Sequence, residues 1–381
     1  MNKPIYFDNA ATTEVFPEVI ENFSRISAEI YGNPHSNHRI GYQARDLLTK
    51  AREQILALLE LEAYQVVFTS GATESNNLAI QGVALSFADR GHHLITTAGE
   101  HPSVMKVFEF LQEHHGFEVT VLPLNEEGVI NLSDLEKALN KNTILVSVMA
   151  VNNQTGAISP LKEIAQLLTK YPKCLFHSDV TQGIAKTKLP YQVLDLLSFS
   201  AHKIHGLKGS GALILKKNLA LKPLFYGGEQ EEGLRSGTVA VPLDVCLAQV
   251  LRLSLKREEE TRTKVQTIHD FLYHQLVKED DLVMNSPLHA SPYIINFSLR
   301  HLPSSVVVEA LSNAGIMVAS TAACSERKNL LSASVLSMFN DQKRAKNTIR
   351  ISFSYDNTME EAQVFLTTLK GIFKKLHEAY L

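Results

Sequence analysis

The chain has 381 residues, and its 37 lysines and arginines against 40 aspartates and glutamates give a formal net charge of −3. With 45% hydrophobic and 20% charged residues it is too apolar for a disordered chain, and its charge gives no sign of a nucleic-acid binder or a polybasic membrane module. The amino terminus lacks the apolar core of a secretory signal, and the longest apolar stretch, around residues 143–151, is far shorter than the ~20 residues of a membrane span.

The first two thirds of the chain alternate helical and strand-like patterns. Apolar residues at helical spacing predict a helix over residues 44–61. Short β-rich runs predict strands at residues 65–69, 94–97, 118–122, 143–148, 174–177, 194–198 and 212–215. Helical stretches lie between several of them, at residues 102–115, 133–140 and 161–170. This order predicts an α/β fold with a largely parallel sheet covered on both faces, whose ligands bind beyond the carboxyl ends of the strands.

A long charged segment, residues 244–280, reads as one helix with a solvated face. We predict that it carries the chain from the large domain into a smaller α+β domain with strands at residues 293–298 and 348–353. The predicted division is a large domain of residues 16–250 and a small domain of residues 1–15 and 251–381.

Three motifs follow predicted strands. The first is residues 70–77 (SGATESNN), where small residues and a helix N-terminus would let backbone amides and the Thr73 hydroxyl hold a phosphate. The second is residues 199–203 (FSAHK), where desolvation would lower the pKa of Lys203 toward that of a usable amine nucleophile, with Ser200 and His202 as phosphate ligands. In the third, Asp179 could keep a pyridine nitrogen protonated and Gln182 could donate to a ring oxygen.

Each motif alone also has an ordinary structural explanation. The first could be a capped strand–turn–helix, Lys203 an exposed loop residue, His202 a hydrogen-bonded core histidine and Asp179 a turn cap. The remaining histidine pairs lack the cysteine or carboxylate spacing of zinc sites, so no metal site is predicted.

Together these motifs resemble those of the pyridoxal-phosphate (PLP) enzymes of fold type I, and within them the cysteine desulfurases that feed iron–sulfur cluster assembly. The resemblance covers nearly the whole chain and rests on motifs in the family's order at residues 6–13, 32–36, 70–77, 99–102, 151–156, 198–203, 234–238, 322–325 and 347–352. It departs from the family at Glu232, where an arginine is usual, and in the loop of residues 325–334.

The resemblance implies a role for each matching residue. Lys203 would bond the cofactor and later move the substrate Cα proton, and His101 would stack on the cofactor ring and assist proton transfer. Asp179 would pair with the ring nitrogen and Gln182 with the ring hydroxyl oxygen. The phosphate and substrate carboxylate would be bound by the remaining residues: Ala72, Thr73, Ser200 and His202 at the phosphate, Thr238 reaching it from the partner subunit of a homodimer, and Asn153 and Arg350 at the carboxylate.

The implied activity is L-cysteine desulfurization, which releases L-alanine and leaves a persulfide on Cys324 for transfer to an acceptor protein, a scaffold or a carrier. The sulfur would serve iron–sulfur cluster assembly or tRNA thiolation. Cys324 is one of three cysteines, too few for a disulfide framework, so a reduced, cytoplasmic location is expected. We expect Cys174 and Cys246 to be buried. The alternatives are a class V aminotransferase, which would not need Cys324, a selenocysteine lyase, or a PLP-fold scaffold without catalysis.

Overall fold

The computed structural model describes residues 4–320 and 331–380. The helices are α1 (Pro17–Glu29), α2 (Arg39–Leu58), α3 (Ala72–Ser86), α4 (Pro102–His115), α5 (Leu132–Ala138), α6 (Leu161–Leu168), α7 (Val241–Leu276), α8 (Ser304–Asn313), α9 (Ala333–Phe339), α10 (Gln342–Lys346) and α11 (Met359–Tyr380), with short 3-10 turns at η1 (Tyr191–Val193), η2 (Ala201–Lys203) and η3 (Gln230–Gly233). The strands are β1 (Ile5–Tyr6), β2 (Tyr64–Thr69), β3 (His93–Thr97), β4 (Glu118–Leu122), β5 (Thr143–Ser147), β6 (Leu175–Asp179), β7 (Leu196–Ser200), β8 (Gly211–Lys216), β9 (Leu282–Met284), β10 (Ile294–Leu299), β11 (Ile316–Met317), β12 (Ala319–Ser320) and β13 (Thr348–Ser352).

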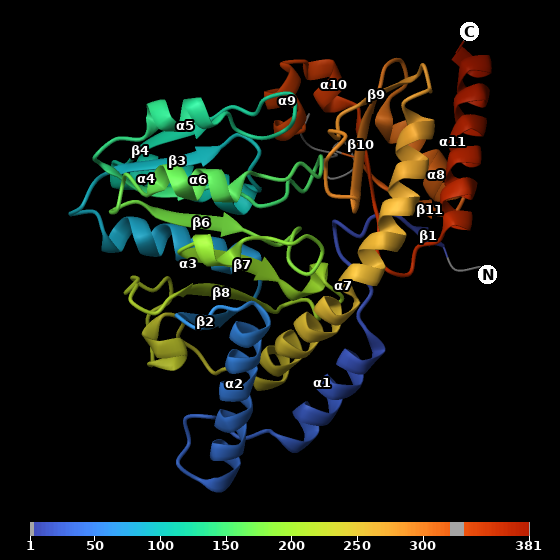
Figure 1. Ribbon diagram of the computed structural model, residues 1–381. Coiled ribbons are helices and arrows are strands. Elements are labelled where there is room, and N and C mark those ends of the chain that lie inside the picture. The colour runs from blue at the N-terminus through green and yellow to red at the C-terminus, as the bar shows by residue number, and fades with distance from the viewer. Residues whose placement is uncertain (1–3, 321–330, 381) are drawn as a thin grey trace.

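The largest sheet has seven strands in the order β2-β8-β7-β6-β5-β3-β4 (Figure 1). The pairs from β7 through β6, β5 and β3 to β4 are parallel, whereas β8 runs antiparallel to both β7 and β2. The predicted α/β fold with a mainly parallel sheet is therefore confirmed, with β8 as a reversed strand.

Two strands extend further toward their carboxyl ends than the sequence predicted. β6 runs to Asp179 and β7 to Ser200, where the predicted strands end at residues 177 and 198. Parallel pairing continues as far as Asp179 opposite Ser198, and His177 Nε2 of β6 lies 3.0 Å from Ser198 Oγ of β7. Asp179 is thus the last residue of a strand, rather than part of the turn after it.

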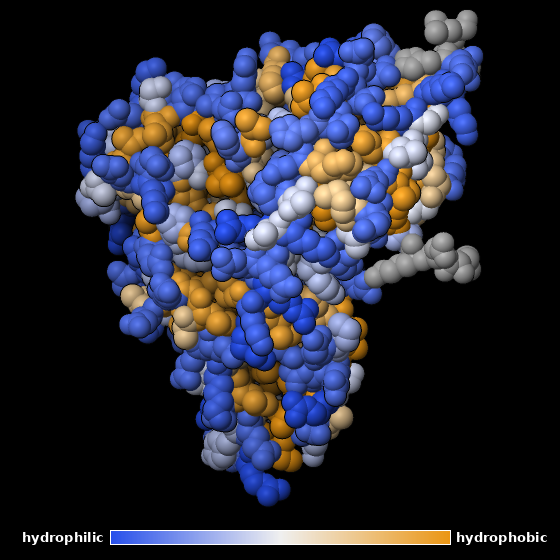
Figure 2. Space-filling view, turned by 45° about the vertical axis from the view of Figure 1, so that its right-hand side comes forward, coloured by the Kyte–Doolittle hydropathy of each residue, from blue (hydrophilic) through white to orange (hydrophobic). Residues whose placement is uncertain are grey.

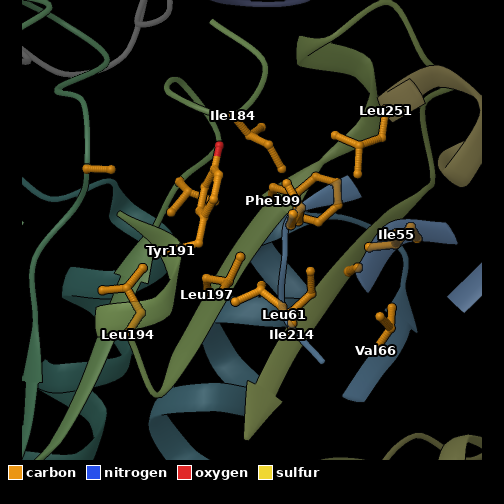
Figure 3. Close-up of a cluster of buried hydrophobic side chains, with 14 of the residues drawn as sticks. Ile55, Leu61, Val66, Ile184, Tyr191, Leu194, Leu197, Phe199, Ile214 and Leu251 are labelled. Atoms are coloured by element: carbon orange, nitrogen blue, oxygen red, sulfur yellow. The ribbon is translucent and has the colours of Figure 1, made fainter. Parts of the chain in front are cut away.

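Side chains alternate between the two faces of this sheet, as the period of a β-strand requires. Val66 and Phe68 of β2 belong to a core cluster shared with Leu48 of α2, while Val67 belongs to a second cluster shared with Leu78 of α3. Figure 3 shows the first cluster, where Phe199 of β7 lies among side chains from β8, α2 and α7. Both faces of the sheet are therefore covered, which keeps the strands and their carboxyl ends in fixed positions.

A second, antiparallel sheet has the order β12-β13-β10-β9. Helix α7 links the two sheets: its first half contributes Val250 and Leu251 to the core of the large sheet, and its second half contributes Val265 and Leu272 to the core beside the small sheet. In Figure 1 this helix runs diagonally between the two parts of the molecule. The N-terminal segment reaches the small sheet through a bridge from Asp8 to Ser352 of β13, and β1 pairs with β11 in a separate two-stranded sheet.

The surface in Figure 2 is mostly hydrophilic, with apolar side chains gathered in patches that include the narrow projection formed by α1 and α2. Within the described part of the chain, none of the helices combines the length and the apolar character that crossing a membrane would require.

Candidate active site

A cavity of about 320 Å³ lies at the carboxyl ends of the parallel strands, as expected for ligand sites of such sheets. Most of the residues that the sequence predicted for the site line this one cavity: Ala72, Thr73, His101, Asn153, Asp179, Gln182, Ser200, His202, Lys203 and Arg350. Thr238 does not line it and is exposed. Cys324 lies outside the described residues.

The turn between β2 and α3 brings a helix N-terminus to the cavity. Gly71 has a φ of 148°, and an added Cβ there would lie 3.2 Å from Ser200 Oγ. The Ala72 amide donates to Ser200 Oγ at 2.7 Å, so the turn after β2 and the end of β7 are joined. Because the first amides of a helix have no partners within it, Thr73 and its neighbours offer donors to an anion at this end of the cavity.

Lys203 lies on η2, directly after β7. Its Nζ donates to the carbonyl oxygens of Ala10 and Ala11, at 2.5 and 2.8 Å. Burial, followed by the nearby Arg350 charge, lowers the pKa of this amine to about 8. A substantial fraction is therefore neutral near physiological pH, which is the nucleophilic form of a lysine.

A hydrogen-bonded chain connects Asp179 to His101 through a residue that the sequence reading did not assign. Asn76, on α3, donates from Nδ2 to Asp179 Oδ2 at 2.8 Å and to Ser103 Oγ at 2.9 Å. Ser103 Oγ in turn lies 2.8 Å from His101 Nδ1, and the Ser103 amide donates to the same nitrogen. Asn76 follows Ala72 by one helical turn, so the two residues lie on the same face of the helix. That spacing is the sequence feature from which Asn76 could have been assigned to the site.

These hydrogen bonds fix which ring nitrogen of His101 carries the proton. Because Nδ1 accepts a backbone N–H, the proton of the neutral ring is on Nε2. Burial lowers the pKa of His101 further than the Asp179 charge raises it, so the ring is neutral at physiological pH. Asp179 itself accepts from the Thr181 amide at 3.0 Å as well as from Asn76. These two hydrogen bonds hold its carboxylate in position at the cavity wall.

Gln182 is held from two sides. Its Nε2 donates to the Ala10 carbonyl at 2.9 Å, and its Oε1 accepts from Nζ of Lys186 at 3.5 Å. Lys186 is buried, and burial together with the charges of Lys203 and Arg350 lowers its pKa to about 7. The Gln182 amide therefore has its oxygen on the Lys186 side and its NH₂ group on the side of Ala10, which also lines the cavity.

Arg350, on β13 of the small sheet, meets the large sheet at the cavity. Its guanidinium donates to the Asn153 carbonyl and to Asp8 Oδ1, both at 2.9 Å. Its Nε is buried with no hydrogen-bond partner among the described residues. Arg350 and Asn153, which the sequence analysis assigned to one site, line the same cavity, and the ion pair of Arg350 with Asp8 was not expected from the sequence.

His202 and Glu100 complete the surroundings. His202 Nδ1 contacts Thr12 Oγ1 at 3.1 Å, and burial, with help from Lys203, lowers its pKa to about 4. Glu100 lies behind His101, where its Oε1 accepts from the Met149 amide at 2.8 Å and from Thr97 Oγ1 at 3.1 Å. The sequence reading did not assign Glu100 either, because burial of a carboxyl group has no local sequence pattern.

The two ends of the cavity carry different chemical groups. One end offers helix amides and the Ser200 hydroxyl to an anionic group, and the other offers the Asp179 carboxylate and the Lys203 amine. The buried Thr181 Oγ1, which also lines the cavity, has no hydrogen-bond partner among the described residues. These hydrogen-bonding groups fit a phosphorylated heterocycle with a basic nitrogen.

Among the described residues, no group of three or more His, Cys, Asp or Glu side chains could hold a metal ion.

Comparisons with known proteins agree with this geometry. The aminotransferase class-V family model matches residues 5–365. A NifS/IcsS protein homolog of Lactobacillus delbrueckii subsp. bulgaricus is 39% identical over 375 residues, 97% of each chain. Cysteine desulfurase IscS of Dictyoglomus turgidum is 35% identical over 381 residues, which are 99% of this chain and 96% of that relative. The solved structure of a NifS-like protein superimposes with a TM-score of 0.90 at 34% identity and covers 97% of this chain and 99% of its own. The chain therefore belongs to the cysteine desulfurase family of class-V aminotransferases, with the fold type I architecture of that family.

Proposed function

We propose that the protein is a PLP-dependent L-cysteine desulfurase. In balanced form, L-cysteine and the Cys324 thiol give L-alanine and a persulfide on Cys324. The observation that carries the proposal is the single cavity in which Lys203, Asp179, His101 and Arg350 meet, in a chain that belongs to this family. The same four side chains argue against a scaffold without catalysis, which would have no use for them.

The residues present fit the cofactor. We assign its phosphate to Ala72, Thr73, Ser200 and His202, its ring nitrogen to Asp179 and its ring hydroxyl to Gln182. When bound, PLP supplies an electron sink for bond changes at the substrate Cα.

The protein's own groups perform the remaining tasks. Arg350, with Asn153, orients the substrate carboxylate, for which the planar guanidinium is suited. We assign removal of the Cα proton to Lys203, whose pKa of about 8 supports a neutral form. We assign stacking on the ring and proton exchange at Nε2 to His101, which is neutral and protonated on that atom.

Cys324 is proposed as the sulfur acceptor on this chain. The two cysteines that the structure describes are poor candidates, because burial raises the thiol pKa of Cys174 to about 12 and that of Cys246 to about 11. The thiolate is the reactive form of cysteine, so neither would be reactive near neutral pH. Of the three cysteines in the sequence, this leaves Cys324.

The assembly and cellular setting are proposals too. We propose a homodimer in which Thr238 reaches the phosphate of the partner subunit, supported by its exposure and by its absence from the lining of its own subunit's cavity. We keep the division into a large domain of residues 16–250 and a small domain of residues 1–15 and 251–381. We also propose a cytoplasmic location and transfer of sulfur to an acceptor protein for iron–sulfur cluster assembly or tRNA thiolation.

Alanine release from L-cysteine tests the activity. With PLP present, the purified protein should release alanine, and Lys203→Ala should release none and lose the absorbance of bound cofactor. Cys324→Ala should keep that absorbance but release no alanine, while the matched control Cys174→Ala should behave like wild type. Alanine from Cys324→Ala would refute the acceptor assignment. Wild-type protein that binds PLP but leaves L-cysteine intact would favour an aminotransferase or a selenocysteine lyase.

A further inference from the structure

The segment from the end of β2 to the first turn of α3 (residues 68–74, the β2–α3 turn) carries an acidic side chain next in sequence to the cavity residue Thr73. Glu74 lies in the first turn of α3, next to Thr73, and its side chain is 9% exposed. Its Oε2 accepts from the Ser70 amide at 2.8 Å, and its Oε1 accepts from Nε of Arg235 at 2.8 Å. Arg235 therefore neutralises a carboxylate whose charge would otherwise repel a phosphate bound next to it.

A second carboxylate, four residues before Arg235 in the sequence, also holds the β2–α3 turn. Glu231, whose side chain is 2% exposed, accepts from the Phe68 amide at 2.9 Å through Oε2. Its Oε1 accepts from Nη2 of Arg52 at 2.5 Å. Glu231 has a left-handed φ of 49°, which is unfavourable for a residue with a side chain and persists where the surroundings hold it.

Side-chain oxygens bind every second backbone amide along the β2–α3 turn. Amides at positions 68 and 70 are bound by carboxylates, and the amide of Ala72 is bound by Ser200 Oγ. Both Glu231 and Arg235 come from the segment of residues 229–238, which ends at Thr238. The segment is thereby fastened to the backbone that precedes the proposed phosphate site.

We propose that Arg235 is a positioning residue for cofactor phosphate: through Glu74, and together with Glu231, it fixes the β2–α3 turn and cancels the negative charge beside the phosphate. This inference rests on the proposed function, since it takes the cavity to bind PLP. Arg235 is expected to affect binding of the phosphate group, with no direct effect on the cofactor ring or on the substrate.

The test compares two ligands that differ only in the phosphate. The full-length protein is freed of cofactor, and its dissociation constants for PLP and for pyridoxal are measured by absorbance titration. Arg235→Ala should weaken PLP about tenfold, since it leaves a buried carboxylate without its partner, and should change the pyridoxal constant by less than about twofold.

A double variant separates charge from structure. In Arg235→Ala/Glu74→Gln the amide oxygen still accepts from Ser70, but the uncompensated charge is gone, so most of the lost PLP affinity should return. The matched control is Lys50→Ala, which removes an exposed ion pair with Asp46, and it should leave both constants unchanged. Circular dichroism confirms that each variant is folded.

The possible results are distinct. An equal loss for PLP and pyridoxal in Arg235→Ala, or no recovery in the double variant, would overturn the inference and leave Arg235 with a structural role only. Failure of wild-type protein to bind PLP at all would instead refute the cofactor proposal, independently of Arg235.

Discussion

At the scale of single residues, the fold changes the protonation state of Glu100, a buried carboxyl group next to His101 in the sequence. It is 5% exposed, and burial, reinforced by the Asp179 charge, raises its pKa from 4.5 to about 8. Both of its described hydrogen-bond donors, the Met149 amide and the Thr97 hydroxyl, reach the same oxygen, Oε1. That pattern suits the carbonyl oxygen of a neutral carboxylic acid, which joins the turn bearing His101 to the loop bearing Asn153.

Glu100→Gln should therefore change how stability depends on pH. The folded protein keeps a proton on Glu100 that the unfolded chain releases above about pH 4.5, so stability falls as the pH rises toward about 8. Relative to Glu100→Gln, whose amide does not titrate, wild type should lose up to about 1.4 kcal/mol of unfolding free energy per pH unit over this window. Urea unfolding of both proteins at several pH values measures the difference, and parallel pH profiles would show that Glu100 is ionised in the fold.

At the scale of elements, the cavity depends on the close approach of β8 to the turn after β2. A Cβ added at Gly211 would lie 2.5 Å from both Gly71 Cα and the Phe199 carbonyl oxygen. These are backbone atoms of neighbouring strands and turns, so they cannot move aside independently. The absence of a side chain at Gly211 is what allows the α3 N-terminus to reach Ser200.

Gly211→Ala should consequently be destabilising by about 1–3 kcal/mol, the usual cost of overpacking, and should weaken PLP binding by displacing the β2–α3 turn. Gly371 on α11 is the matched control, because nothing lies within 4 Å of a Cβ added there. Gly371→Ala should stabilise the helix by up to about 1 kcal/mol. Thermal unfolding and PLP titration measure both, and equal effects of the two substitutions would contradict this account of Gly211.

At the scale of the whole molecule, the site brings together distant parts of the chain. Arg350 from the small sheet, Lys203 from the large one and the carbonyls of Ala10 and Ala11 meet at one cavity. The Thr13 amide also donates to the His202 carbonyl, which anchors the N-terminal segment across the site. The proposed substrate binding by Arg350 and the proposed proton transfer by Lys203 therefore depend on how α7 and the N-terminal segment hold the two sheets together.

Complementation between subunits tests the proposed assembly. Lys203→Ala and Thr238→Ala should each impair alanine release as homodimers, because one lacks the amine in both sites and the other lacks the phosphate ligand. In a heterodimer, one site would receive Lys203 from its own subunit and Thr238 from the partner subunit. Mixing and re-forming the dimers should restore up to about a quarter of wild-type activity, since half the dimers would have one intact site of two. Activity that stays additive would place Thr238 outside the partner's site.

The order of elements, the sheet class and most of the cavity residues could be predicted from the sequence by itself. Hydrophobic periodicity marks strands and helices locally, and Ala72, Asp179, Ser200 and Lys203 stand near strand ends, where parallel sheets bind their ligands. Only the tertiary structure decided the partners of those residues. Asn76 between Asp179 and Ser103, Asp8 on Arg350 and Arg235 on Glu74 are contacts between segments up to 342 residues apart. Such pairings depend on the register and packing of the two sheets, and no local pattern encodes them, because each side chain alone has many possible partners before the chain folds.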